Sequence, residues 1–134
     1  MNIIYQTSYH TILYDANANI IGNRWDKSTA DISAEEFKAE IMEFQKIIET
    51  KHPKGIMGNT LDLLFPISPE IQDWIVNNLF AAIVPAGVKK YAIVVPSDFL
   101  TQLSVEQTVE SETSGGFQTK YFDNETAALD WING

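Results

Sequence analysis

The chain has 134 residues, a net charge of −9 and a hydrophobic content of 45%. A chain of this length and apolar content forms one domain with its own core, which excludes an intrinsically disordered protein. It contains no cysteine, which excludes disulfides, thiolate zinc sites, iron–sulfur clusters and cysteine nucleophiles. The negative charge argues against a nucleic-acid partner, because a polyanion would be repelled.

Hydropathy and charge along the chain indicate the cellular location of the protein and the kind of surface that it presents. The longest apolar run, residues 79–84, is too short to span a bilayer, and the first ten residues lack the basic and apolar segments of a signal peptide. We therefore expect a cytoplasmic protein that makes no membrane contact. The net negative charge is concentrated in residues 91–134, and such an acidic surface either keeps the protein soluble or receives a basic partner protein.

The first elements form a predicted β-hairpin. Residues 3–5 and 9–14 are typical of strands, with Tyr and Ile at short spacing. Residues 15–19 predict a turn, because Asp and Asn tolerate the left-handed backbone conformation, and residues 20–25 form the return strand.

A helix is predicted to begin after Ser33. Ser33 and Glu36 have the spacing of a capping box, and an apolar stripe follows at helical spacing. We expect the acidic residues Glu36, Glu40 and Glu43 to lie on a solvated face of this helix. His52 and the proline after it end the helix.

Helices and strands alternate in the rest of the chain. Residues 56–64 predict a buried strand and a loop, and Ser68 followed by proline predicts the start of a second helix, whose buried stripe includes Trp74. Residues 91–95 are typical of a central parallel strand, residues 96–110 of a helical region, and residues 117–122 of a final strand before a last helix. This order predicts an α/β fold with a mixed, mostly parallel sheet of about five strands, an N-terminal hairpin and covering helices.

Several segments carry a resemblance to a known family. They are Trp25, residues 33–37, the pair Leu61 and Asp62, residues 67–74, residues 87–92, the pair Glu106 and Gln107, and residues 121–132. With these segments the chain resembles the small bacterial STAS-fold proteins, the group named after sulfate transporters and anti-sigma-factor antagonists. It is most similar to an uncharacterised branch labelled STAS-like or CRAL-TRIO-like. The resemblance implies a single STAS-like domain over residues 1–134 that acts as a regulatory, protein-binding module.

The resemblance also implies a phosphorylation site, although the sequence departs from the family there. Anti-sigma-factor antagonists carry an Asp-Ser-Ser-Gly-type segment after the third strand, in which a partner kinase phosphorylates a serine. Ser68 lies near the corresponding place without the flanking pattern. Ser68 is therefore a candidate phosphorylation site, and helix capping alone also explains it.

Motifs for catalysis or cofactor binding are absent from the sequence. It has no phosphate-binding loop, no dinucleotide-binding glycine pattern and no nucleophile elbow. His10 and His52 have no partner at metal-ligand spacing, so we expect both to be polar surface residues. We predict neither catalytic residues nor a metal or cofactor, and hence no enzyme.

The candidate binding site lies beyond the carboxyl ends of the parallel strands, where α/β proteins bind ligands. The residues expected there are Asp62, Phe65, Ser68, Ser97 and Asp98. Trp25 is a further candidate anchor if it is exposed, and Glu106 and Gln107 could form a recognition patch. The leading hypothesis is a non-catalytic module that binds a protein, which could be a second copy of itself. The alternative is a small-molecule or lipid carrier, which would need an apolar cavity.

Overall fold

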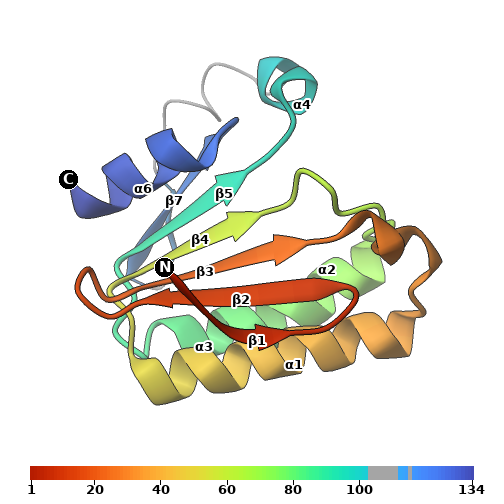
Figure 1. Ribbon diagram of the computed structural model, residues 1–134, viewed down its shortest axis with the longest axis horizontal. Coiled ribbons are helices and arrows are strands. Elements are labelled where there is room, and N and C mark those ends of the chain that lie inside the picture. Colours follow the sequence, from red (N-terminus) through yellow and green to blue (C-terminus); the bar gives the residue numbers. More distant parts are fainter. Residues whose placement is uncertain (103–111, 115) are drawn as a thin grey trace.

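The structure is a computed structural model that describes residues 1–102, 112–114 and 116–134. Its centre is one mixed sheet of seven strands in the order β1-β2-β3-β4-β5-β7-β6 (Figure 1). The strands are β1 (Asn2–Gln6), β2 (His10–Asp15), β3 (Ile20–Trp25), β4 (Gly55–Asn59), β5 (Lys90–Val94), β6 (Glu112–Ser114) and β7 (Phe117–Phe122). The helical segments are η1 (Lys27–Asp31), α1 (Ala34–Lys51), α2 (Pro69–Ile75), η2 (Val76–Phe80), α3 (Ala81–Ile83), α4 (Ser97–Gln102) and α6 (Glu125–Asn133).

The predicted α/β fold with an N-terminal hairpin is confirmed. Strands β3, β4, β5 and β7 are parallel neighbours, and β1, β2 and β6 add antiparallel pairs at the two sides of the sheet. The strand count differs from the expected five, because β1 is a separate strand and residues 112–114 form β6. The sequence predicts no strand at residues 112–114, because glycines follow them directly and are typical of a break in regular structure.

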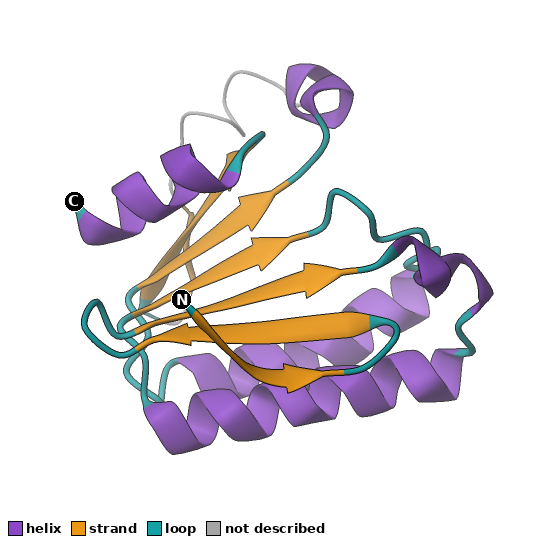
Figure 2. Cartoon of the chain, in the orientation of Figure 1, coloured by secondary structure: helices purple, strands orange, loops and turns teal. Residues whose placement is uncertain are grey.

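Helices cover the two faces of the sheet unequally (Figure 2). We call the first face the α1 face, because α1, α2, η2 and α3 pack on it and form the larger core. On the other face, the α6 face, α6 contacts β4, β5 and β7. Strand alternation divides the side chains between these cores: Ile21 and Ile56 face α1, whereas Ile20 and Met57 face α6. Among the described residues, no helix combines the length and apolar character that a membrane span requires.

Local signals in the sequence placed the helix starts correctly. The Ser33 side chain accepts a hydrogen bond from the backbone N–H of Glu36, whose carboxylate accepts one from the backbone N–H of Ser33, so the capping box is confirmed. Ser68 caps α2 and Asn124 caps α6 in the same way. Trp74 was expected in the buried stripe of α2, and it is half-buried, packed against the larger core beside the Lys38 ammonium.

Two expectations about polar residues are wrong. His10 was expected at the surface, yet its exposed fraction is 1%, because even-numbered residues of β2 face α1. Glu40 was expected on a solvated helix face, yet it is buried, because it lies three residues after Phe37 and four before Phe44, both in the core. Trp25 is also buried, so it offers no exposed anchor.

Candidate functional site

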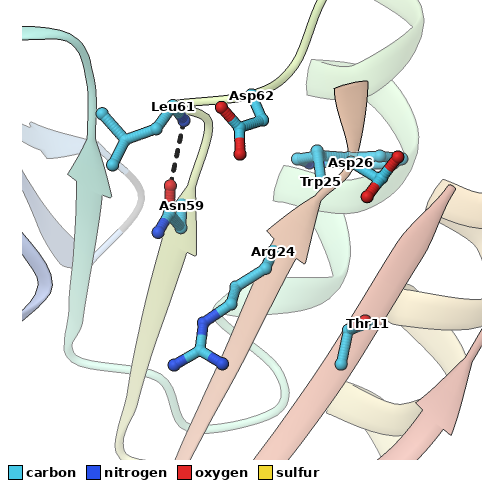
Figure 3. A pocket seen from close by; sticks show the side chains of 7 residues that line it. All are labelled: Thr11, Arg24, Trp25, Asp26, Asn59, Leu61 and Asp62. Atoms are coloured by element: carbon cyan, nitrogen blue, oxygen red, sulfur yellow. Dashed lines mark hydrogen bonds between the residues drawn. The ribbon is translucent and has the colours of Figure 1, made fainter. Parts of the chain in front are cut away.

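A recess of about 240 Å³ lies at the carboxyl ends of β3 and β4. Thr11, Arg24 and Asn59 line it from three adjacent strands, and Asp26 and Asp62 line it from the segments that follow β3 and β4 (Figure 3). Trp25 and Leu61 complete the lining. Parallel strands bring their carboxyl ends to one edge of a sheet, so this place follows from the fold.

The polar side chains on one side of the recess are held by α6. The Arg24 guanidinium donates two hydrogen bonds of 2.9 Å to the Glu125 carboxylate, and the Asn59 amide donates one of 2.6 Å. These hydrogen bonds hold the pKa of Glu125 below its usual range, and the largest effect comes from Arg24. Asn59 also accepts a hydrogen bond from the backbone N–H of Leu61 (Figure 3). The recess therefore has a fixed, hydrogen-bonded wall.

The segment of residues 60–68, which we call the β4 loop, follows the recess and is tied down along its first half. The Thr60 N–H and hydroxyl both donate to the Val94 carbonyl, at 2.9 and 2.7 Å. The fully buried Thr29 hydroxyl accepts from the Leu64 N–H at 2.9 Å. Leu61 and Leu64 nevertheless remain 40% and 52% exposed. The loop thus holds two apolar side chains in solvent, and Leu61 is one of the residues that line the recess.

The structure brings some of the predicted β4-loop residues to the recess and directs others elsewhere. Asp62 is exposed and lines the recess as expected. The Phe65 ring stacks on Phe37 with 4.6 Å between ring centroids, so it packs on the core. Ser68 is exposed, and its hydroxyl accepts the Ile71 N–H at the start of α2.

The second segment predicted at the site, Ser97 and Asp98, lies at the start of α4, which follows β5. β4 and β5 are parallel neighbours as predicted, but the chain after β4 runs to α2 and the chain after β5 to α4, on opposite sides of the sheet (Figure 1). Ser97 and Asp98 are exposed, and the Ser97 hydroxyl donates to Asp123 at 3.2 Å. Glu106 and Gln107 lie outside the described residues.

Comparison with known proteins identifies no relative of this chain. No family model, curated protein or solved structure matches the chain. The function of the site therefore has to be argued from its own geometry.

A buried polar cluster lies behind the recess, on the α1 face. The Glu40 carboxylate accepts hydrogen bonds from Tyr5, Thr7 and His10, at 3.2, 3.1 and 3.2 Å. His10 Nε2 lies 2.9 Å from the Asn23 amide nitrogen, and this contact requires an unprotonated Nε2. Together these contacts match a neutral imidazole that donates from Nδ1 to an ionised carboxylate.

The titration of the cluster follows from burial and hydrogen bonding. Burial lowers the pKa of His10, and Glu40 only partly opposes that shift. Burial by itself would raise the pKa of Glu40, but the hydrogen bonds from His10, Thr7 and Tyr5 outweigh it, so the pKa lies below its usual range. Burial, followed by the charge of Glu40, raises the pKa of Tyr5 to about 12.

Trp25 connects this cluster to the recess. Its ring stacks on His10, with centroids 3.9 Å apart and planes 4° from parallel, and it also lines the recess. Within residues 1–102, 112–114 and 116–134, no group of three or more His, Asp or Glu side chains is placed to hold a metal ion.

The sequence did not single out Arg24, Asn59, Leu61 or Leu64 as site residues. A usable signal was their position: Arg24 and Asn59 are at the carboxyl ends of strands, and the two leucines follow β4 directly.

Proposed function

We propose that the chain is a non-catalytic module that binds a protein through the recess and the exposed leucines of the β4 loop. The observation that carries this proposal is the pair of exposed leucines on one ordered loop, Leu61 and Leu64, of which Leu61 lines a polar recess. Apolar side chains surrounded by polar groups are typical of protein interfaces, in which a small apolar centre supplies most of the affinity.

The fixed backbone of the β4 loop supports this function. A flexible loop would lose conformational entropy on binding, which lowers affinity. Hydrogen bonds from Thr60 to β5 and from Leu64 to Thr29 already order the loop, and Phe65 fixes it to the core. Leu61 and Leu64 therefore present their surface with little further ordering cost.

The chemistry of the recess favours a partner that offers a basic side chain beside an apolar one. Asp26 and Asp62 are exposed at its rim, whereas the nearby Arg24 is already paired with Glu125. The whole chain also has a net charge of −9, which attracts basic partners at long range.

A regulatory role of the STAS-like type agrees with this surface. Because the His10 imidazole is 1% exposed, it cannot reach a substrate from solvent, and this supports a non-catalytic role. Ser68, at the end of the β4 loop, is exposed and remains a candidate phosphorylation site. A carrier of lipids would need an enclosed apolar cavity, whereas this recess is open and has a polar wall, so the protein-binding function is the better supported one.

Affinity purification with matched surface variants tests the proposal. The bait proteins are the wild type, the double variant Leu61→Ser with Leu64→Ser, and the control Val84→Ser, which alters an exposed apolar residue after α3. We expect a protein held by the wild type and the control to lose affinity for the double variant by about tenfold or more. Equal binding to all three baits would contradict the proposed surface, provided that their melting curves agree.

A further inference from the structure

The outer edge of β1, at one side of the sheet, is a second surface on which a partner could bind. Among the residues that the structure describes, β1 is the first strand in the sheet order and pairs only with β2, so the backbone groups of its other edge have no partner strand there. Soluble proteins usually protect such an edge with charged residues, proline or a covering segment. The edge of β1 has neither charge nor proline, because its sequence is Asn-Ile-Ile-Tyr-Gln.

Apolar side chains accompany this unprotected edge. Ile3 is 56% exposed, Ile4 is 40% exposed and Met1 is 44% exposed. A β-bulge between Ile3 and Tyr5 adds local twist without covering the edge. On the α6 face the described helix α6 contacts β4, β5 and β7 and stays clear of β1 (Figure 1).

The charge distribution indicates what pairs with this edge. The first charged side chain of the sequence is Asp15, so β1, the turn after it and most of β2 carry no charged side chain. Two copies with a charge of −9 each repel one another across most of their surfaces, but not where two such uncharged segments meet. β1 itself offers a basic partner no charged side chain, and the Glu40 carboxylate that Tyr5 contacts is buried and already accepts three hydrogen bonds.

The geometry of the sheet selects β1 of the second copy as the partner strand. At the opposite side of the sheet, β6 is only three residues long and includes Glu112. A pairing of β1 with β6 would also be head-to-tail, whereas a pairing of β1 with β1 is symmetric and closes as a dimer. We propose that two copies of the chain associate through antiparallel pairing of their β1 strands, independently of the recess and the β4 loop.

Sedimentation equilibrium over a range of protein concentrations tests this dimer. We expect the wild type to dimerise, and to do so more strongly at high salt, because salt screens the repulsion between the two negative chains. Ile4→Lys should be monomeric with an unchanged melting curve, since a lysine places like charges on both strands of the pair. The control Val76→Lys, at an exposed apolar residue of η2, should dimerise like the wild type.

Amide hydrogen exchange supplies a second measurement that does not depend on the folding of a variant. In the wild type, exchange from residues 2–6 should slow as the protein concentration rises, because the pairing protects edge amides. A wild type that stays monomeric at all concentrations would overturn the proposal. A dimer whose β1 exchange is independent of concentration, or one that the folded Ile4→Lys variant forms equally well, would also overturn it.

Discussion

Replacing Glu40 with glutamine should destabilise the protein far more than its place on a surface helix would suggest. The carboxylate accepts hydrogen bonds from Tyr5, Thr7 and His10, and its side chain is only 10% exposed. Glutamine carries no charge, and its single acceptor oxygen can serve Tyr5 and His10 as one carboxylate oxygen does now, while the Thr7 hydroxyl has to turn and accept from the amide. A hydrogen bond to a charged acceptor contributes about 1.5–3 kcal/mol and one to a neutral acceptor about 0.5–1.5 kcal/mol, so weakening three such bonds gives a total loss of about 2–3 kcal/mol.

This loss can be measured as a change in the free energy of unfolding in urea, or as a fall in melting temperature. For a chain of 134 residues, 2–3 kcal/mol corresponds to a fall of about 7–11 °C. Glu43→Gln is the matched control, because Glu43 is 41% exposed and forms a surface ion pair with Lys46 at 3.5 Å; it should change stability by less than about 0.5 kcal/mol. If Glu40→Gln were as mild as this control, the buried cluster would not stabilise the fold.

The pH dependence of the same variant gives an independent check. The pKa of Glu40 in the folded protein lies below its ordinary value of 4.5, so the ionised carboxylate stabilises the fold fully above about pH 4.5. That contribution is lost as the pH falls through the lower, folded pKa. The stability difference between wild type and Glu40→Gln should therefore be largest near neutral pH and should shrink in acid. A difference that grew in acid would refute the assignment of an ionised Glu40.

Two further predictions concern His10 and Ser68. Because burial holds the pKa of His10 below 6.5, the unfolded chain binds a proton there before the folded one does, so wild-type stability should fall as the pH drops below 6.5, by at most about 1.4 kcal/mol per pH unit. His10→Gln should remove this slope in denaturation experiments at a series of pH values, and loss of the slope in His52→Asn instead would contradict the assignment. Ser68→Ala should cost about 1 kcal/mol because α2 loses its cap, whereas Ser68→Asp keeps a capping oxygen and should leave the melting curve nearly unchanged. Equal melting temperatures for these two Ser68 variants would show that the cap contributes little.

The parts of the fold that depend on local sequence were predictable. Ser33, Ser68 and Asn124 each satisfy backbone groups within the next three residues, so their capping role can be identified without tertiary information. β6 was not predictable, because a strand of three residues depends on its neighbour β7 for its existence.

The place of the recess was predictable, but its lining was not. Topology put it at the carboxyl ends of the strands, and Asp62 lies there. Phe65 was expected at the site but packs on the core, because a large aromatic residue in a loop can pack inward as readily as outward, and Phe37 supplies an inward partner. Leu61 and Leu64 stay exposed on a loop whose backbone is fixed by hydrogen bonds to Asn59 and to the buried Thr29.

The buried cluster was missed because the partners lie far apart in the sequence. His10 and Glu40 are separated by 30 residues, and each is an ordinary surface type when considered alone. A signal was nevertheless available on the helix: Glu40 has the same helical spacing as Phe37 and Phe44, which is the spacing of a buried position. A charged residue on an apolar stripe should therefore prompt a search for a buried partner.

The cluster and the recess are mechanically connected, because they share Trp25. The indole stacks on His10 and on Phe37, at centroid distances of 3.9 and 5.1 Å, and Trp25 is also one of the residues that line the recess. His10 is itself held between Glu40 and Asn23. A polar cluster in a core that could have been apolar fixes one orientation of each ring, since every member has directional bonds to satisfy. The stability of the cluster and the shape of the binding recess should therefore change together in variants of Glu40, whereas variants of Leu61 and Leu64 should alter binding without altering stability.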